Sequence, residues 1–483
     1  MRNQIVSLGK DTLIYGIGSV LLRFISILTL PLFTSYLSPE SYGVLAMVGF
    51  LGMVIQPIFG LGISAAMGPN YFEKDDFFEK SKVVWSSFVI CLISVIILVF
   101  ISFFFSPFIG QLILLPSKYT SCITLSLFGC VFTILASPFV QRVQFEKKVF
   151  FYISVVLGCS ILSILLSIYL VVYKSQGVVG MLWGQLLGNF TMFVAFMFAA
   201  IRSTKISISD KLIKSLLRLG LPLVPSFALL FVLMHSNKYI LKWLIGLDAV
   251  GIYSVGFSFG MTISIVTTGI ATAWYPFFMG YANRQNEARI LFGRVTSYYI
   301  LGVGFLCLIF FLFANPILTL LSQNSFHQAY IVIGNVAVAN FAQTLFNFFL
   351  PGLYFNKEIR YVSLIQGTAA LLSIPINYLL IKQYSILGAG IGLAIGNLLM
   401  AGLMYCWIFF NQEKYIKVEY EWKRIILFIC LSIIIIITHI LLPTLKLKGE
   451  IIKSIILSCA TLLGIIVLLS KQEKQFLLKK INS

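Results

Sequence analysis

Apolar residues fill long stretches of this chain, and short polar segments separate them. Each stretch is long enough for a helix rising 1.5 Å per residue to cross a hydrocarbon core about 30 Å thick. Membrane β-strands would be about half as long and would alternate polar and apolar residues, so the pattern predicts helices. The predicted spans are residues 11–36, 42–69, 83–107, 119–140, 149–173, 178–201, 219–236, 249–273, 297–321, 328–351, 361–381, 385–410, 425–443 and 451–470. The expected fold class is an all-α integral membrane protein with fourteen transmembrane helices.

Glycines form a second pattern, which repeats 208 residues further along the chain. Gly43 recurs as Gly251, and a run of three glycines at four-residue spacing recurs in the same way. The two runs are Gly180, Gly184 and Gly188, and then Gly388, Gly392 and Gly396. Several matches in one order at nearly one offset predict an internal duplication. We expect the two glycine runs to permit close helix packing within each half.

The duplication divides the chain into three parts. Residues 1–205 form an N-terminal six-helix lobe and residues 206–412 form a second one, while residues 413–483 add two helices and a basic tail. Because six is even, both lobes enter the membrane with the same polarity. Parallel repeats of this kind are related by an axis along the membrane normal, and such transporters bind substrate between the halves near the midplane.

Positive charge orients the predicted spans. Of the 35 lysine and arginine residues, 26 fall on the side that holds both termini, 8 fall on the opposite side, and Arg23 lies within the first span. Cytoplasmic segments carry this excess, so both termini are expected to be cytoplasmic. The first apolar stretch is too long for a cleavable signal peptide and is expected to remain as an anchor.

Composition agrees with a membrane protein and excludes several other classes. The chain of 483 residues is 59% hydrophobic and 11% charged, with a net charge of +19 that reflects topology and anionic lipid headgroups rather than nucleic acid. All eight cysteines fall within predicted spans without a Cys-x-x-Cys pair, so neither a metal site nor a disulfide framework is expected. No Walker A motif and no long loop occur, so we expect no cofactor and no catalytic domain.

The first span carries an arginine at membrane depth, about twelve residues from either end. Thr12, Gly16, Ser19, Arg23 and Ser26 are spaced by four and three residues in turn, which places them on one helix face. A charge at the bilayer centre costs about 2.5–3.5 kcal/mol even on lenient scales, so this face is expected to look away from lipid. We favour a hydrated cavity with an anionic ligand; the alternative is that Arg23 hydrogen-bonds carbonyls of a neighbouring helix.

Other polar residues within or beside the spans complete the candidate substrate site. In the second half, polar groups near residues 231–238 match the position of Arg23, and two amides of the tenth span align with Thr133 and Ser137 at an offset of 210 residues. Besides Ser19, Arg23 and Ser26, the candidates are His235, Asn237, Lys238, Arg142, Gln343 and Asn347. A packing role for His235, a boundary role for Lys238 and a positive-inside flanking role for Arg142 remain open alternatives.

Acidic residues are confined to loops and span edges. All sixteen lie there, which leaves no obvious proton or sodium site in the interior. An interior that is cationic rather than acidic suits a negatively charged substrate and disfavours a cationic drug.

The segment SLGKDTLIYGIGSVLLRFISILTLPLFTSYLSPESYGVLA and its echo LIGLDAVGIYSVGF resemble the Wzx-type flippases of bacterial polysaccharide synthesis (O-antigen and related repeat units). These belong to the multidrug/oligosaccharidyl-lipid/polysaccharide exporter superfamily, and the resemblance covers essentially the whole chain. It implies a V-shaped pair of six-helix, MATE-like lobes in the bacterial inner membrane. It also implies that the chain moves an undecaprenyl-diphosphate-linked oligosaccharide from the cytoplasmic to the periplasmic leaflet, in one pathway with a polymerase and glycosyltransferases.

Under this interpretation Arg23 would bind the diphosphate, and Asn, Gln and Ser side chains would face the sugar. The chain would then be a transporter and not an enzyme. The alternatives are a MATE-like exporter of small molecules, which should show a buried carboxylate or an aromatic, acidic cavity, and a membrane polysaccharide polymerase or ligase. A polymerase or ligase needs a charged outer loop, whereas the outer loops of this chain are short and nearly uncharged.

Overall fold

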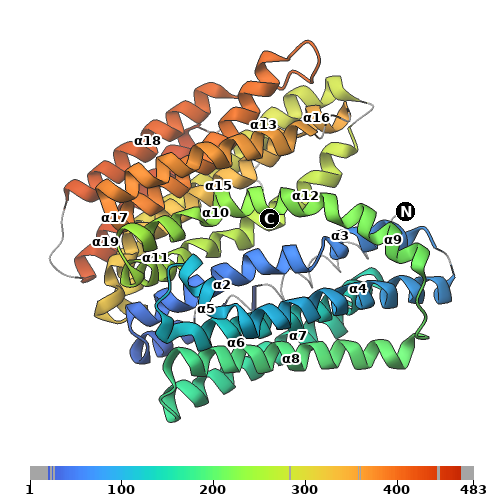
Figure 1. The fold of residues 1–483 in the computed structure, drawn as a ribbon. Helices are drawn as coiled ribbons and strands as arrows, with labels where there is room; N and C mark the ends of the chain where they lie inside the picture. The colour runs from blue at the N-terminus through green and yellow to red at the C-terminus, as the bar shows by residue number, and fades with distance from the viewer. Residues whose placement is uncertain are drawn as a thin grey trace. The chain divides into compact units, whose positions relative to one another are not determined.

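The computed structural model is helical throughout its ordered elements (Figure 1). It describes residues 20–21, 24–25, 28–74, 76–281, 284–356, 358, 360–442 and 447–468, and within these ranges it contains no β-strand. Eleven of the described helices are long and apolar enough to cross a membrane. The prediction of an all-α, multi-pass membrane protein is therefore confirmed. The count of fourteen spans stays a prediction, because half of the first span lies outside the described residues.

The chain forms two compact units, Met1–Ser254 and Val255–Ser483. The helices of the first unit are α2 (Pro39–Phe59), α3 (Ile63–Phe72), α4 (Phe77–Phe104), α5 (Ser106–Leu112), α6 (Thr120–Phe145), α7 (Val149–Ile168), α8 (Gly177–Ser203), α9 (Asp210–Gly220) and α10 (Val224–Leu244). Helix α11 (Leu247–Gly260) begins in the first unit and ends in the second. The remaining helices are α12 (Ser264–Met279), α13 (Gln285–Leu312), α14 (Ala314–Leu321), α15 (Tyr330–Phe348), α16 (Pro351–Phe355), α17 (Arg360–Phe410), α18 (Trp422–Leu441) and α19 (Leu447–Leu468).

Helix α6 occupies the centre of the first unit, where it packs against α2, α4 and α8. Phe139 of α6 is fully buried and lies beside Trp85 and Phe88 of α4, with ring centroids 5.5 and 5.1 Å away. By contrast, α4 leaves Ile96 and Phe103 exposed on its other face. Large exposed apolar side chains on one face are expected where lipid replaces water as the solvent.

Two of the predicted spans are broken by short turns. Within the span predicted at 42–69, α2 contains Pro57 and ends at Phe59, with Gly60 as its C-cap. The chain restarts as α3 after Gly62, which has a φ of +65°. The span predicted at 297–321 corresponds to α13, which begins twelve residues earlier, and to the short helix α14. Hydropathy alone cannot locate such turns, because the residues on both sides are equally apolar.

The glycines of α8 lie against α7, and the same arrangement occurs within α17. A Cβ added at Gly184 would lie 2.1 Å from Oγ of Ser167, and one at Gly188 would lie 2.5 Å from Cβ of Ser163. Helix α17 changes direction at Ser385, where φ is +52°, and its second half returns along the first. There, a Cβ at Gly392 would lie 2.2 Å from Oδ1 of Asn377. In each unit the glycines therefore allow two consecutive helices to approach to backbone contact.

The core of the second unit is aromatic. Trp274 and Phe348 stack with centroids 4.5 Å apart, and Phe292 and Tyr299 lie in the same buried cluster. The two C-terminal helices pack on this unit: Ile435 of α18 and Leu457 of α19 join a buried cluster with α13. Polar contacts fix α19 to the same unit, since Asn315 of α14 donates to Glu450 at 2.7 Å and Ser454 donates to the Leu312 carbonyl of α13 at 2.6 Å.

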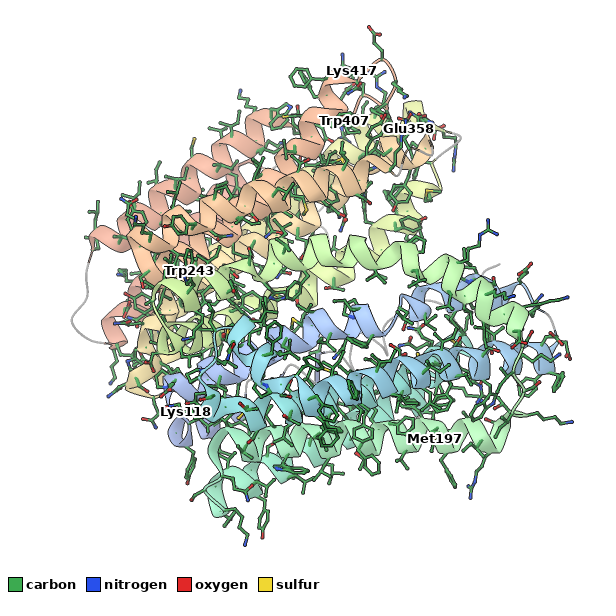
Figure 2. The ribbon with its side chains drawn as sticks, viewed as in Figure 1. Lys118, Met197, Trp243, Glu358, Trp407 and Lys417 are labelled. Carbon is green, nitrogen blue, oxygen red and sulfur yellow. The ribbon has the colours of Figure 1, made fainter. Side chains whose placement is uncertain are left out.

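A polar cluster ties two loops at one end of the second unit, where Glu358, Trp407 and Lys417 are labelled in Figure 2. The carboxylate of Glu358 accepts hydrogen bonds from Lys414 and from the hydroxyl of Tyr415. The hydrogen bond from Lys414 is the main reason that the pKa of Glu358 lies below its ordinary value. The cluster joins the loop before α17 to the loop after it.

Candidate substrate cavity

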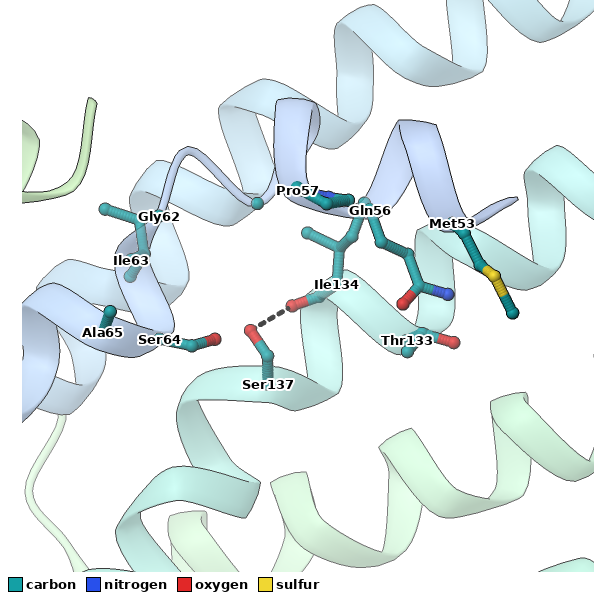
Figure 3. A pocket seen from close by; sticks show the side chains of 11 residues that line it. Met53, Gln56, Pro57, Gly62, Ile63, Ser64, Ala65, Thr133, Ile134 and Ser137 are labelled. Atoms are coloured by element: carbon teal, nitrogen blue, oxygen red, sulfur yellow. Dashed lines mark hydrogen bonds between the residues drawn. The ribbon is translucent and has the colours of Figure 1, made fainter. Parts of the chain in front are cut away.

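A cavity of about 360 Å³ lies within the first unit, between α2, α3 and α6 (Figure 3). Gln56 of α2 extends toward Thr133 of α6, while Ser64 of α3 and Ser137 of α6 point into the same space. The remaining lining residues are Met53, Pro57, Gly60, Gly62, Ile63, Ala65 and Ile134.

A second cavity of about 210 Å³ lies between α2, α6 and α8. Its polar lining residues are Gln56, Ser126, Gln185 and Asn189. Met53 and Gln56 line both cavities. The side chain of Gln56 therefore stands where two polar hollows of the first unit meet.

Helical spacing explains why these residues share one interior. On α2, Gly49, Gly52, Met53 and Gln56 follow steps of three, one and three residues, which keeps them on one face. On α6, residues 126, 129, 130, 133 and 137 do the same. Three of these positions are glycine, and their missing side chains leave the space that the polar groups line.

Three of the hydroxyl groups around the cavities already donate hydrogen bonds to backbone carbonyls. Thr133 donates to the Gly129 carbonyl at 3.0 Å, Ser137 to the Ile134 carbonyl at 2.9 Å, and Ser126 to the Val48 carbonyl at 3.1 Å. Each hydroxyl has one proton and two lone pairs, so its oxygen can still accept. The amides of Gln56 and Gln185 carry both donors and acceptors. The walls can therefore hydrogen-bond a ligand that is rich in hydroxyl groups.

No charged residue lines either of these two cavities. Groups of three or more histidine, cysteine, aspartate or glutamate side chains that could hold a metal ion are also not found among the described residues. The two hollows thus suit a neutral polar group, such as a sugar, better than a cation.

Three of the predicted site residues, Ser19, Arg23 and Ser26, lie outside the described residues. Their role as an anion site stays a prediction. Gln56 and Gln185 were missed by the sequence analysis. The sequence alone could have indicated both as candidates, because each is an uncharged polar side chain inside a predicted span, where polar groups are costly.

Three predicted candidates lie together on α10. Asn237 is buried and donates to the hydroxyl of Tyr253, and its own Oδ1 accepts from the backbone N–H of Lys238 at 2.9 Å. His235 lies against the ring of Phe231, with centroids 5.2 Å apart. None of the three lines either cavity. A substrate role for the three stays a prediction.

Two further candidates, Gln343 and Asn347, lie on α15 in the second unit and are partly buried. The backbone carbonyl of Asn347 accepts a hydrogen bond from the indole of Trp274 at 2.9 Å. Neither side chain lines the two cavities of the first unit. A substrate role for them stays a prediction.

Arg142 lies in the last turn of α6 and is only 3% exposed. Its Nε lies 2.6 Å from Oε1 of Glu146, and the second carboxylate oxygen of Glu146 lies 2.7 Å from Nζ of Lys148. To bind a substrate anion, Arg142 would first have to exchange this internal partner. The geometry in this conformation is that of a buried structural ion pair.

The substitution Arg142→Ala is expected to lower the free energy of unfolding by about 3 kcal/mol, because it leaves the carboxylate of Glu146 partly buried without its closest cation. Thermal unfolding of the detergent-solubilised protein measures the change. The double variant Arg142→Ala, Glu146→Gln is expected to recover part of the loss, and Lys148→Ala, whose side chain is 53% exposed, is expected to have little effect. Equal stability of Arg142→Ala and the parent would contradict the structural role.

Comparison with known proteins supports the fold and identifies a family. Residues 8–282, more than half of the chain, match the family model described as polysaccharide biosynthesis protein. The structure is similar to that of the lipid II flippase MurJ in an inward closed conformation, with a TM-score of 0.71, 14% identity, and coverage of 93% of this chain and 97% of that one.

Transporter structures are similar as well. An inward-facing multidrug resistance MATE family transporter of the MOP superfamily gives a TM-score of 0.65 at 16% identity, covering 82% of this chain and 98% of that chain. The Vibrio cholerae MATE transporter VcmN gives a TM-score of 0.53 at 14% identity, covering 84% and 95%. No curated protein sequence gives a significant match. All three structures share 16% identity or less with this chain, and their similarity shows a common fold.

Proposed function

Because the chain belongs to the polysaccharide biosynthesis protein family, we propose that it is a flippase for undecaprenyl-diphosphate-linked oligosaccharide repeat units. It carries them from the cytoplasmic to the periplasmic leaflet of the bacterial inner membrane, with both of its own termini in the cytoplasm. A polymerase and the glycosyltransferases that build the repeat unit are its expected partners. The fold supports the transport of a lipid-linked molecule, since MurJ shares that fold.

The observation that carries this proposal is the neutral, amide-lined and hydroxyl-lined interior of the first unit. A sugar needs hydrogen-bond partners at its hydroxyl groups, and Gln56, Thr133, Ser137, Gln185 and Asn189 supply them inside a membrane protein. Gln56 and Gln185 are exposed in these hollows, and Thr133, Ser137 and Asn189 are partly exposed, so a ligand can reach their polar groups. Uncharged polar side chains in the middle of apolar spans are costly, which argues for a function.

In this proposal the three chemical parts of the substrate have different surroundings. The sugar meets the amides and hydroxyls of the cavity, the diphosphate meets Arg23, and the polyprenyl chain stays in lipid. Moving an anion outward across a membrane that is negative inside is favourable by about 2.3 kcal/mol per charge per 100 mV. The membrane potential can therefore bias export without a coupling carboxylate.

A MATE-like exporter of small molecules is the second candidate, because such transporters share the fold. An exporter of cationic drugs is expected to carry an acidic group in its cavity, and neither cavity of the first unit contains one. The two functions are separated by a transport assay in proteoliposomes with a lipid-linked oligosaccharide and, separately, a cationic dye as substrate.

The variant Gln56→Leu tests the cavity. It keeps the size of the side chain and removes its amide, so each lost hydrogen bond to sugar should cost about 0.5–1.5 kcal/mol, or roughly 2- to 10-fold in the flipping rate. The rate is measured in cells as the fraction of lipid-linked intermediate that an external, membrane-impermeant reagent can reach. Gln111→Leu is the matched control, since Gln111 lies on α5 and lines neither cavity. If Gln56→Leu flipped the substrate at the wild-type rate, the cavity would not be part of the substrate path.

A further inference from the structure

Each of the three helices that enclose the larger cavity has a proline in its interior. Pro57 lies inside α2, Pro69 inside α3 and Pro138 inside α6. Proline has no backbone N–H, so it cannot donate the helical hydrogen bond to the carbonyl of the residue four positions earlier. All three of those earlier residues line the same cavity of about 360 Å³. They are Met53, Ala65 and Ile134.

The fold supplies a replacement donor for one of these three carbonyls. Ser137 donates its hydroxyl proton to the Ile134 carbonyl at 2.9 Å, and Ile134 itself is only 3% exposed. Serine and threonine side chains commonly satisfy a carbonyl that proline leaves without its donor inside a membrane helix. Met53 and Ala65 are instead exposed, and both line the cavity. Water or a ligand in the cavity can therefore donate to their carbonyls.

Main-chain atoms form another part of the cavity wall, at the break between α2 and α3. Gly60 and Gly62 lie in this break, and both line the cavity. Because glycine has no side chain, only peptide groups can form the wall at these two positions. Figure 3 shows Gly62 beside the side chains of Ser64 and Ala65 at this end of the cavity. The chain thus exposes its backbone to the cavity where prolines and glycines interrupt the helices.

The polar groups that line this cavity accept more hydrogen bonds than they donate. The protons of Thr133 and Ser137 already go to carbonyls, so a ligand meets these two hydroxyls at their oxygen lone pairs. The two carbonyls left without a helical donor add acceptors, whereas Gln56 and Ser64 can both donate and accept. A neutral sugar with unsubstituted hydroxyl groups brings the protons that this wall needs. The carboxylate of an acidic sugar would meet lone pairs instead.

We propose that Pro57 and Pro69 are positioning residues for the substrate, because they leave the carbonyls of Met53 and Ala65 open to accept hydrogen bonds from sugar hydroxyls. The cavity then selects repeat units whose sugar at this position is uncharged and carries unsubstituted hydroxyl groups. This inference rests on the proposed flippase function. It adds to that function that the backbone, and not only the amide and hydroxyl side chains, recognises the sugar.

Pro69→Ala is the sharper of two test variants, because Pro69 lines neither cavity and its replacement leaves the side chains of the wall unchanged. Alanine supplies the missing N–H, so the helix takes up the Ala65 carbonyl and the sugar loses this acceptor. The variant is expected to unfold at the same temperature as the parent or at a higher one, because it gains a helical hydrogen bond. Pro57→Ala removes the Met53 carbonyl in the same way.

The measurement is the dissociation constant of lipid-linked sugars for the full chain in nanodiscs. The probes are undecaprenyl diphosphate carrying glucose or N-acetylglucosamine, and analogues in which one sugar hydroxyl at a time is replaced by fluorine, which cannot donate. At least one replacement should weaken binding to the parent by about 2- to 10-fold, the effect of one hydrogen bond. That loss should disappear in Pro57→Ala or in Pro69→Ala, because the acceptor is already gone.

Pro276→Ala is the matched control. Pro276 lies inside α12 of the second unit, and Thr272, four residues earlier, lines neither cavity. This variant should retain the full effect of fluorine. An equal effect of fluorine in the parent and in both test variants would overturn the role of the carbonyls and leave the flippase proposal intact. Equal binding of all the fluorinated and natural sugars by the parent would overturn it too. If the parent binds neither lipid-linked sugar, the proposed function fails, and the present inference fails with it.

Discussion

The substitution Gly184→Val is expected to lower the free energy of unfolding by about 3 kcal/mol or more, the upper range for overpacking a tight interior. A Cβ alone at this position would lie 2.1 Å from Oγ of Ser167, 2.7 Å from its backbone N, and 2.8 Å from the Ser163 carbonyl oxygen. The hydroxyl can rotate away, but the two backbone atoms can move only if α7 separates from α8. Domains are typically stable by only about 5–15 kcal/mol, so this loss should lower both the unfolding midpoint and the yield of folded protein.

The yield of monodisperse protein in mild detergent and its thermal unfolding midpoint measure this effect. Gly158→Val is the matched control, because Gly158 lies on α7 with no atom within 4 Å of an added Cβ. Gly392→Val should be milder than Gly184→Val, since its nearest obstacle is the side-chain oxygen of Asn377, which can turn away. Equal yields and midpoints for the variants at 184 and 158 would show that the helices can separate at no cost.

Hydropathy was sufficient to predict the fold class, because a helix is the element that satisfies its own backbone in lipid. It was insufficient for the turns inside apolar segments. The break at Gly62 depends on a backbone conformation with positive φ, and the apolar residues around it give no hydropathy signal. The turn at Ser385 was predicted, because the polar residues before it separate the spans at 361–381 and 385–410. The glycine runs, by contrast, were informative, because a missing side chain has a direct consequence for how closely two helices approach.

The cavity itself was not predictable from one helix at a time. Gln56 is a lone polar residue between Ile55 and Pro57, and no periodic polar face surrounds it. Its significance appears only when α2, α6 and α8 are packed and the glycines beside it leave space. Thr133 and Ser137, which the sequence analysis noted only as the equivalents of Gln343 and Asn347, line a cavity, since spacing of four residues keeps both on the same face of α6.

Ion pairing also depends on tertiary structure. The sequence shows Arg142 and Glu146 four residues apart, a spacing that permits a pair on any helix, exposed or buried. Only the fold shows that Arg142 is 3% exposed. Because Arg142 is buried beside Glu146, removing it is expected to cost folding free energy. This structural role weakens the case for Arg142 as a substrate ligand.

Replacing Arg23 by alanine is expected to reduce flipping by about 30-fold or more while the protein still folds. Removing one member of a desolvated charge pair costs about 2–5 kcal/mol, and the diphosphate would lose the cation that offsets its own desolvation. The measurement is the sidedness of lipid-linked intermediates, which should accumulate on the cytoplasmic leaflet, together with the amount of surface polysaccharide.

Arg23→Lys separates charge from geometry. Lysine retains the positive charge but cannot form the paired hydrogen bonds that a guanidinium makes with phosphate oxygens, so flipping should recover only in part. Arg284→Ala is the control for a change of net charge, since Arg284 is 63% exposed and lies 3.8 Å from Glu287. If alanine at position 23 flips as well as the parent, the arginine hydrogen-bonds a neighbouring helix instead. If Arg23→Ala is unfolded rather than folded and inactive, Arg23 is again assigned to a hydrogen bond with a neighbouring helix. The reason is that an anion site facing a hydrated cavity should tolerate an uncharged side chain.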